Sequence, residues 1–224
     1  MSRITTATID TLSNTTPLVM TTANNTTAMY IFPANSTISI NATQVVKNGI
    51  VLGGGKKTLW ISASQFIPRL TNGPASGQYA MATTGINFKT YDFDPATIET
   101  AEFDVRFPKS WDKGTITFIP IVSQTTTSSG STLWNVSAVA ISSSEALDVA
   151  LGTPQTVTVS QGSANTMYIG AESSPITIAG SPQNGDMIHF AVNRYATSGS
   201  DTLAIDGRLH GVTILYTANT DTDT

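Results

Sequence analysis

The chain has 224 residues, of which 37 are threonine, only 12% are charged and none is cysteine, and its net charge is −4. An ordinary globular domain has about 25% charged residues. The lack of cysteine excludes a disulfide framework, a cysteine-ligated zinc site, an iron–sulfur cluster and thiol catalysis, and the acidic balance gives no electrostatic footprint for nucleic acid. Threonine is β-branched and favours strands, so the composition predicts an all-β protein with a neutral, hydrogen-bonding surface.

The chain begins Met-Ser-Arg-Ile-Thr, with one basic residue and no apolar stretch behind it. This start does not match a signal peptide. No apolar run approaches the ~18 residues of a membrane span. We therefore expect synthesis in a cytoplasm and no insertion into a membrane.

Residues 1–55 differ from the rest because they are rich in Thr, Asn and Ser, with short strand-like pieces at residues 28–32 and 37–40. A tight turn is predicted at residues 47–50 and a flexible break at residues 53–55. We predict that residues 1–55 form an extended N-terminal arm or small β-unit that attaches the protein to a larger particle. The alternative is that they supply the first strands of one continuous domain.

Residues 56–224 are predicted to form the main domain. The clearest strand covers residues 101–107, where Ala101, Phe103 and Val105 point to one side and Glu102 and Asp104 to the other. The stretch 115–122 is apolar on both faces and contains Pro120, which requires a sheet edge or a bulge. Its second face would be covered either by a neighbouring subunit or by the loop at residues 123–131.

One short helix is predicted near residues 142–150, because Ser142 and Glu145 have the spacing of a capping box and Gly152 and Pro154 follow as stop signals. Every other segment reads as a short strand with turn residues at regular spacing. The predicted fold is an all-β, jelly-roll-like antiparallel β-sandwich. A closed β-barrel is the alternative.

The two histidines are the first candidates for catalysis. On regular strands, His189 shares a face with Met187, Ala191 and Asn193, and His210 shares a face with Val212, Ile214 and Tyr216. Asp186 or Asp206 with one of many serines would complete a hydrolase triad, but no G-x-S-x-G motif is present. We interpret both histidines as structural residues and predict no catalytic residue and no cofactor.

Acidic residues cluster between positions 92 and 104. Asp92 and Asp94 share a strand face, so they suit either a carboxylate pair or two calcium ligands. The simpler interpretation is a strand end entering a turn at Pro95, with acids that are solvated or paired with arginine. The sequence leaves metal binding by this pair open. The full cluster is Asp92, Asp94, Glu99, Glu102 and Asp104.

Two further patterns have a chemical interpretation. Residues 53–58 (GGGKKT) resemble the end of a phosphate-binding loop but lack its first glycine and precede a strand rather than a helix. Aromatic side chains offer a flat apolar face for a sugar ring. We place Trp60 and Trp134 in the core and favour Trp111 and Tyr79. The aromatic candidates are Trp60, Trp111, Trp134, Tyr79, Tyr91, Tyr168, Tyr195 and Tyr216.

Several strings between residues 58 and 217 carry a resemblance to a known group of proteins. They are Trp60-Ile61-x-Ala63, Asn72-Gly73-Pro74, Asp92-Phe93-Asp94, Phe107-Pro108-Lys109-Ser110-Trp111-Asp112-x-Gly114-x-Ile116-Thr117-Phe118, Ala146-Leu147-Asp148, Gly152-Thr153-Pro154-Gln155-Thr156-Val157, Ile176-Thr177-Ile178-Ala179-Gly180-Ser181-Pro182-x-x-Gly185-Asp186 and Asp206-x-Arg208-Leu209-x-Gly211-Val212. Together they resemble virion proteins of tailed bacteriophages from marine and alphaproteobacterial hosts, a group of tail-fibre and structural proteins. The resemblance carries over no binding residue.

The resemblance implies a non-enzymatic virion structural protein, made in the host cytoplasm. We expect a homotrimer attached to tail or capsid proteins through its N-terminal arm and displayed like a fibre or spike, with a host-surface glycan or protein as its target. One alternative is a capsid decoration or head-fibre protein that stabilises the shell. Another is a glycan-cleaving tailspike domain, which needs two carboxylates facing each other across a cleft.

Overall fold

The computed structural model describes residues 45–47, 50–52, 55–220 and 223. These residues form strands and one short 3-10 helix, η1 (Ala63–Gln65). In chain order the strands are β1 (Val45–Lys47), β2 (Ile50–Leu52), β3 (Gly55–Ser62), β4 (Ile67–Pro68), β5 (Ala75–Ala80), β6 (Asn87–Phe93), β7 (Thr100–Val105), β8 (Thr117–Ser123), β9 (Gly130–Ile141), β10 (Gln155–Gln161), β11 (Tyr168–Ile169), β12 (Met187–Arg194) and β13 (Gly207–Ala218).

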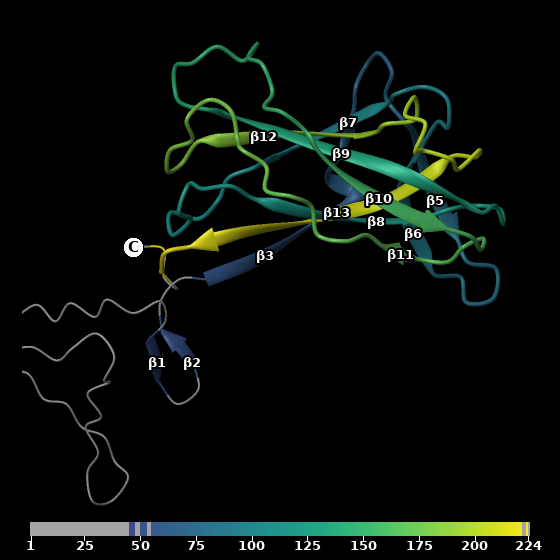
Figure 1. Cartoon of the computed structure of the whole chain (residues 1–224), viewed down its shortest axis with the longest axis horizontal. Coiled ribbons are helices and arrows are strands. Elements are labelled where there is room, and N and C mark those ends of the chain that lie inside the picture. The colour runs from purple at the N-terminus through teal and green to yellow at the C-terminus, as the bar shows by residue number, and fades with distance from the viewer. Residues whose placement is uncertain (1–44, 48–49, 53–54, 221–222, 224) are drawn as a thin grey trace, which may run out of the picture. The chain divides into compact units, whose positions relative to one another are not determined.

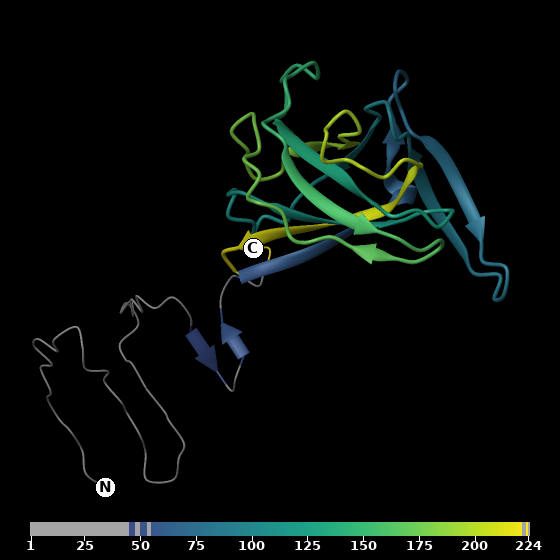
Figure 2. The same ribbon diagram turned by 45° about the vertical axis from the view of Figure 1, so that its right-hand side comes forward.

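Strands β3 to β13 form two antiparallel sheets that stack as layers (Figures 1 and 2). One sheet has the order β10-β9-β12-β7-β4, and the other has the order β11-β8-β13-β6-β5 with β3 added beside β13. From β6 to β9 each successive strand lies in the opposite sheet, and so do β11, β12 and β13. The predicted all-β, jelly-roll-like antiparallel sandwich is therefore confirmed.

The core lies between the two layers and follows the alternation of each strand. In β9, Trp134, Val136 and Ala138 all face the core and are fully buried. The predicted strand at residues 101–107 is confirmed as far as Val105, where β7 ends. Phe103 on β7 lies opposite Phe190 on β12, and their rings stack 4.7 Å apart. Aromatic pairs at this separation add to the free energy gained from burial.

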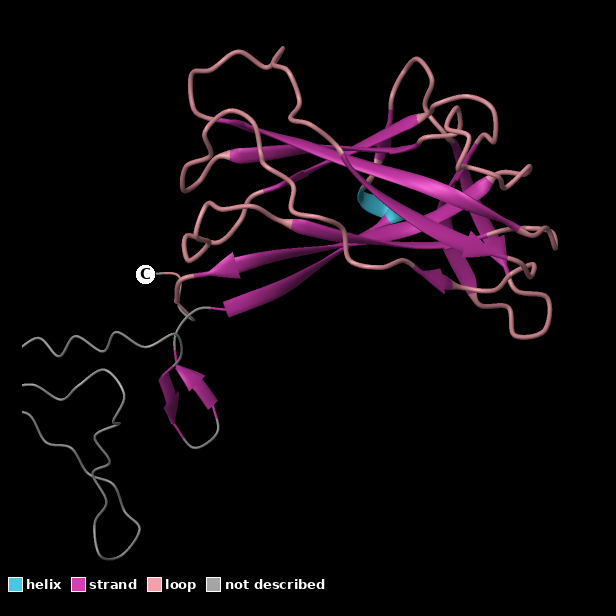
Figure 3. Cartoon of the chain, in the orientation of Figure 1, coloured by secondary structure: helices cyan, strands magenta, loops and turns pink. Residues whose placement is uncertain are grey.

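The predicted helix near residues 142–150 is wrong. One of the two hydrogen bonds of a capping box does form: the Ser142 amide donates to the Glu145 carboxylate at 2.8 Å. Ser144, however, has a φ of 71°, which a right-handed helix does not allow. Leu147 is 77% exposed, so no core contact compensates for this break. The segment is a loop that joins β9 to β10 (Figure 3).

Pro120 lies at a position of β8 where the sheet does not need the amide hydrogen that proline lacks. Its carbonyl accepts from the Gly170 amide at 2.9 Å, so its nitrogen faces the same side, towards β11. That strand ends at Ile169, opposite Ile121. The proline therefore borders the end of a two-residue edge strand, as the sequence predicts. Ile119 and Ile121, on the second face of β8, stay half-exposed in the single chain.

Strands β1 and β2 pair antiparallel with Lys47 opposite Ile50, whereas residues 48 and 49 of the tight turn predicted there lie outside the described residues. The predicted pieces at residues 28–32 and 37–40 lie outside the described residues, as does most of the predicted arm at residues 1–55. The division into an arm and a main domain stays a prediction. Within the described part of the chain, no helix has the length and apolar character needed to cross a membrane.

Candidate binding site

The central strand of the six-stranded sheet changes its neighbour halfway along. The first part of β13 pairs with β6, with Leu209 opposite Tyr91, and the later part pairs with β3, with Gly211 opposite Ser62. Between these two pairings the register against β8 shifts, so His210 is an extra, bulged residue. The place where β6 gives way to β3 forms a groove on the outer face of this sheet, lined in part by Ser62 and His210.

Gly211 makes this bulge possible. Its φ is 156°, and a Cβ atom there would lie 2.3 Å from the Ile61 carbonyl oxygen and 2.6 Å from Cη2 of Trp60. A bulge re-aims the side chain beside it. The predicted shared face of His210 with Val212 and Ile214 is therefore wrong, because those two residues are in the core while His210 lines the outer groove.

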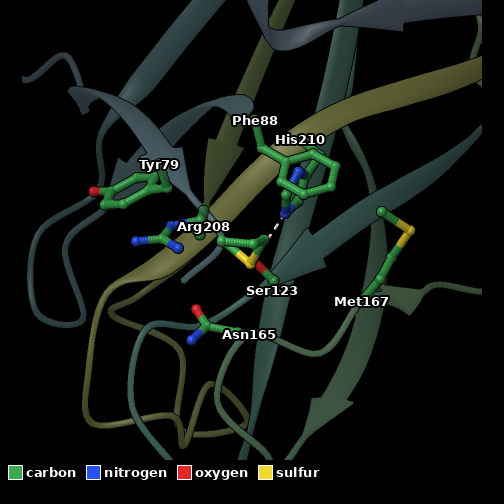
Figure 4. A pocket seen from close by; sticks show the side chains of 8 residues that line it. Tyr79, Phe88, Ser123, Asn165, Met167, Arg208 and His210 are labelled. Atoms are coloured by element: carbon green, nitrogen blue, oxygen red, sulfur yellow. Dashed lines mark hydrogen bonds between the residues drawn. The ribbon is translucent and has the colours of Figure 1, made fainter. Parts of the chain in front are cut away.

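Tyr79 and Arg208 form the floor of the groove (Figure 4), and both contact Asp92. Asp92 on β6 accepts from the Tyr79 hydroxyl, from Thr90 Oγ1 at 3.3 Å and from Arg208 Nε at 3.3 Å. The Tyr79 ring lies on the Arg208 guanidinium, with Cζ 3.2 Å from the ring centre. The hydrogen bond to Asp92, and then burial, raise the pKa of the Tyr79 hydroxyl. Tyr79 therefore stays a neutral donor.

Gly77 lets Tyr79 lie in this position. A Cβ atom on Gly77 would meet the Tyr79 ring at 2.4 Å, so the absence of a side chain lets the ring lie flat along β5. The ring then reaches across β6 towards Asp92 and Arg208. The position of this aromatic side chain is thus set by a backbone feature two residues away.

His210 lies beside the floor of the groove and is held from two sides. Its Nε2 is 2.8 Å from Ser123 Oγ on β8, and the edge of the Phe88 ring meets its ring at 5.5 Å (Figure 4). Burial, and then the charge of Arg208, lower the pKa of the imidazole. His210 is therefore neutral at neutral pH and can act there as both a donor and an acceptor of hydrogen bonds.

Apolar side chains line the groove beyond His210. Trp60 on β3 is 44% exposed, and Met167, just before β11, is 51% exposed. A cavity of about 60 Å³ lies between Arg208 and His210, and it is flanked by two wider hollows of about 300 and 360 Å³. Trp60 lines the first of these hollows and Asn165 lines the second.

This arrangement joins flat apolar surfaces to a few fixed polar groups. Arg208 is only 3% exposed, yet its Nη2 has no hydrogen-bond partner among the described residues. A buried donor without an acceptor costs free energy, so an acceptor such as water, an ion or a ligand would stabilise it. Concave sites of this kind bind small ligands, since apolar walls provide affinity and a few polar groups fix the orientation.

The histidines do not form a hydrolase triad in the described part of the chain. His210 has Ser123 as a partner, but no carboxylate there is hydrogen-bonded to it. His189 shares the outer face of the other sheet with Met187, as predicted, and its Nδ1 lies 2.7 Å from Asp104 Oδ1. A triad needs the base to be oriented by a third group.

Asp92 and Asp94 have separate structural roles. Asp92 contacts the two side chains that form the floor of the groove, whereas Asp94 Oδ1 accepts from the Ala96 and Thr97 amides at 2.6 and 2.8 Å. The predicted turn with one acid paired to arginine matches this geometry. No three His, Cys, Asp or Glu side chains of the described segments come together to hold a metal ion.

The remaining acids of the cluster also have neighbours. Glu102 Oε1 accepts from Arg69 Nε at 2.6 Å on the five-stranded sheet, and Glu102 and Asp104 lie on the same face of one strand. They do not face each other across a cleft. Burial raises the pKa of Glu99, the last acid of the cluster.

Asp206 and Asp186, the candidate acids of a triad, lie outside the cluster. Burial raises the pKa of Asp206, and Asp186 accepts from the Gln183 amide at 2.7 Å in a turn.

The segment 53–58, which resembles the end of a phosphate-binding loop, leads into a strand, as predicted, because β3 begins at Gly55. Lys56 pairs with Glu172 across the sheet edge. Residues 53 and 54 lie outside the described residues. The part of this segment that the structure describes therefore adopts strand geometry.

The aromatic candidates separate clearly. Trp134 is in the core, as predicted. Tyr79 lies on β5 and lines the groove, and its contact with a sugar stays a prediction. Two assignments are wrong: Trp111 is buried against Phe107 at 4.5 Å, and Trp60 is exposed in the groove. Tyr91 is buried, Tyr168 and Tyr216 are half-buried, and Tyr195 is 41% exposed outside the groove.

Sequence reasoning missed Arg208, Phe88, Asn165 and Met167. One signal was present, because a glycine inside a strand pattern indicates a bulge or a close backbone approach, and Gly211 has both. Leu59 and Ile61 flank Trp60, so alternation would have put the indole on the opposite face from these two apolar residues. The cluster itself depends on strand order, which no local pattern reveals.

No protein-family model matches this chain, and no curated protein matches it. Its fold is similar to that of several solved structures. A family 35 carbohydrate-binding module from Clostridium thermocellum is 14% identical, with a TM-score of 0.40, and the match covers 70% of this chain and 97% of that one.

A family 11 carbohydrate-binding module from the same organism, in complex with a β-1,3-1,4-mixed-linked tetrasaccharide, is 9% identical, with a TM-score of 0.38. That match covers 73% of this chain and 95% of the module. A family 28 module specific for non-crystalline cellulose is 10% identical at a TM-score of 0.37, and the match covers 70% of this chain and 86% of that module. These similarities concern the fold alone and identify no binding residue.

Proposed function

We propose that this chain is a non-catalytic glycan-binding protein whose ligand lies in the groove on the outer face of the six-stranded sheet. The observation that carries the proposal is the exposed Trp60 indole beside a floor of positioned polar groups. Indole rings pack against the apolar faces of other molecules while their surroundings stay wet. Arg208 and His210 lie next to this surface and supply directional hydrogen bonds.

The setting we propose is the surface of a bacteriophage particle, as a fibre-like or spike-like homotrimer. The resemblance to virion proteins and the low charge support this setting, since closely packed copies with few charges repel one another little. Weak sugar contacts gain strength when several copies bind one surface. A cryo-EM map of the particle would test the setting: copies on the tail support it, and copies regularly covering the capsid favour the decoration alternative.

The test of the groove is a binding measurement with the full chain. We would screen a panel of soluble polysaccharides and then measure the affinity of the best ligand by calorimetry for the parent, Trp60→Ala and Tyr195→Ala. The two aromatic residues are matched in exposure, at 44% and 41%. We expect Trp60→Ala to weaken binding about tenfold, a loss of about 1.4 kcal/mol.

The control variant distinguishes the groove from other surfaces. Tyr195 lines neither the cavity nor the two wider hollows, so Tyr195→Ala should bind like the parent. Equal losses in both variants would place the ligand elsewhere. Circular dichroism of each variant would show that the fold is retained.

A further inference from the structure

We propose that the cavity between Arg208 and His210 accepts a small anionic substituent of the bound sugar, a carboxylate or a sulfate, held by the Arg208 guanidinium. This inference rests on the proposed function, because it names the class of glycan that the groove binds. It starts from the one cationic side chain among the four buried, unpartnered polar groups of the described residues. These are Trp111 Nε1, Gln124 Oε1, Gln161 Oε1 and Arg208 Nη2.

The bond that Arg208 makes inside the protein leaves much of its hydrogen-bonding capacity unused. Its Nε reaches Asp92 Oδ1 at 3.3 Å, whereas a good charge-assisted bond measures about 2.7–2.9 Å. Asp92 also accepts from Tyr79 and Thr90, so its charge is shared among three donors. Among the described residues, the guanidinium thus makes one long hydrogen bond from Nε and packs on the Tyr79 ring, while Nη2 has no acceptor.

The size of the cavity selects what can reach this donor. A volume of about 60 Å³ holds a few water molecules or one functional group, and a whole sugar ring is larger. The hollows on either side, at about 300 and 360 Å³, are large enough for rings. A substituent that projects from a ring in a flanking hollow would therefore enter the cavity while the ring packs near Trp60 or Asn165.

The nature of the donor selects the charge of the substituent. Hydrogen bonds between a guanidinium and an anionic oxygen are roughly twice as strong as neutral ones. A neutral hydroxyl would fill the same space but would leave the cation poorly matched in a site with little water. The neutral imidazole of His210 and the Ser123 hydroxyl border the same cavity and add donors without a competing negative charge.

The test compares ligand pairs that share a sugar backbone, one member of each pair with a charged substituent and the other without, measured by calorimetry on the full chain. One pair is oligogalacturonate and its methyl ester, and the other is dextran sulfate and dextran. We expect the charged member of at least one pair to bind about tenfold more tightly than its neutral partner. The pair that shows the preference distinguishes a carboxylate from a sulfate.

Two variants show which part of the groove prefers the charged member of each ligand pair. Because Arg208→Gln alone leaves Asp92 without its cation, the variant to use is the double change Asp92→Asn with Arg208→Gln, which keeps the site neutral. It should bind both members of a pair equally. The control is Lys89→Gln, which removes a cation that lines the neighbouring hollow. This control should keep the preference.

The outcomes separate this inference from the proposed function. If charged and neutral ligands bind equally and both depend on Trp60, the groove binds glycans but the anionic subsite is wrong. If the preference survives the double change and is lost in Lys89→Gln, the charge is recognised at the rim and the inference is overturned. If no member of either pair binds the parent while other glycans do, the inference also fails. If no glycan binds at all, both proposals fail.

Discussion

Two buried arginines show how differently the same side chain is used at two places in this sandwich. Arg194, at the end of β12, is 0% exposed and donates to both Asp201 oxygens and to the carbonyls of Phe93, Leu203 and Ile205. Arg208, at 3% exposure, donates to Asp92 at 3.3 Å and packs on the Tyr79 ring, but its Nη2 has no hydrogen-bond partner in the described residues.

The difference separates a structural residue from a residue of the proposed binding site. Arg194 ties the loop that leads to β13 onto the end of β6, and its donors all have acceptors within the chain. Buried polar groups that are fully satisfied make a region rigid. Arg208 instead lines the cavity, and its Nη2 has no acceptor among the described residues. Both arginines are buried, so the two regions differ in whether every hydrogen-bond donor of the arginine has an acceptor.

The largest effect is expected from Arg194→Met. This change leaves Asp201, whose side chain is 1% exposed, without its cation and leaves three carbonyls without a donor. Breaking a buried pair in this way costs about 3–5 kcal/mol. Urea denaturation would measure the free energy of unfolding. Arg106→Met, at an exposed arginine bonded to the Gly185 carbonyl, is the control and should lose less than about 0.5 kcal/mol.

The next largest effect is expected from Gly211→Ala. The new methyl group would meet the Ile61 carbonyl and the Trp60 ring, so the bulge beside Arg208 would have to shift. We expect a loss of about 2–3 kcal/mol in the free energy of unfolding. Gly199→Ala is the control, because nothing lies within 4 Å of a Cβ atom there. An unchanged stability in Gly211→Ala would contradict the geometry of the bulge.

Arg208→Met should cost less than Arg194→Met, by our estimate about 1–2 kcal/mol. It removes the cation of Asp92 and the packing of the guanidinium on Tyr79, but the ion pair is long at 3.3 Å and Asp92 keeps the hydroxyl donors of Tyr79 and Thr90. The same denaturation series would measure both arginine variants. Equal losses would show that Arg208 is as structural as Arg194, and the contrast between the two regions would then disappear.

The smallest effect is expected at His210 and depends on pH. Burial lowers the pKa of His210 in the folded protein below its ordinary value of 6.5, so the unfolded chain binds the proton more readily. The parent should therefore lose stability as the pH falls from about 7 through 6.5 towards the lowered folded value. His210→Gln should show a flatter profile over this window in thermal unfolding.

Glu99 and Asp206 act with the opposite sign at lower pH. Burial raises their pKa values, so the folded state binds protons more readily than the unfolded chain as the pH falls through their range. This is why the profile of His210→Gln is compared with that of the parent over the range from pH 7 to 5.5. Identical profiles in that range would contradict the buried position of His210.

The sequence predicts the layers of this fold better than it predicts the groove. Alternation on strands such as β9 identifies core residues, because the inward side chains from Trp134 to Ala140 are apolar and the pattern depends on that strand alone. The groove depends instead on which strands become neighbours: Tyr79, Phe88, Ser123 and Arg208 come from four different strands. A one-residue bulge at His210 also reverses the face of a residue that alternation assigns with ease.

The helix prediction failed for a similar reason. Ser142 and Glu145 form the local contact that the motif requires, at 2.8 Å. A helix of one or two turns needs an apolar face packed on the core, but the Leu147 side chain is exposed to solvent. Local signals fix local hydrogen bonds, whereas the continuation of an element depends on tertiary packing that the sequence motif does not contain.

The pairing of β13 with β8, β6 and β3 has a consequence for the order of events during protein synthesis. These three partners leave the ribosome long before residues 207–218 do, and they have no common neighbour until that strand arrives. Contacts so distant in sequence form slowly. The groove, whose lining includes two side chains of β13, is thus completed among the last features of the domain. A nascent chain that stalls before this strand lacks the groove and leaves the edges of β8, β6 and β3 without their partner strand.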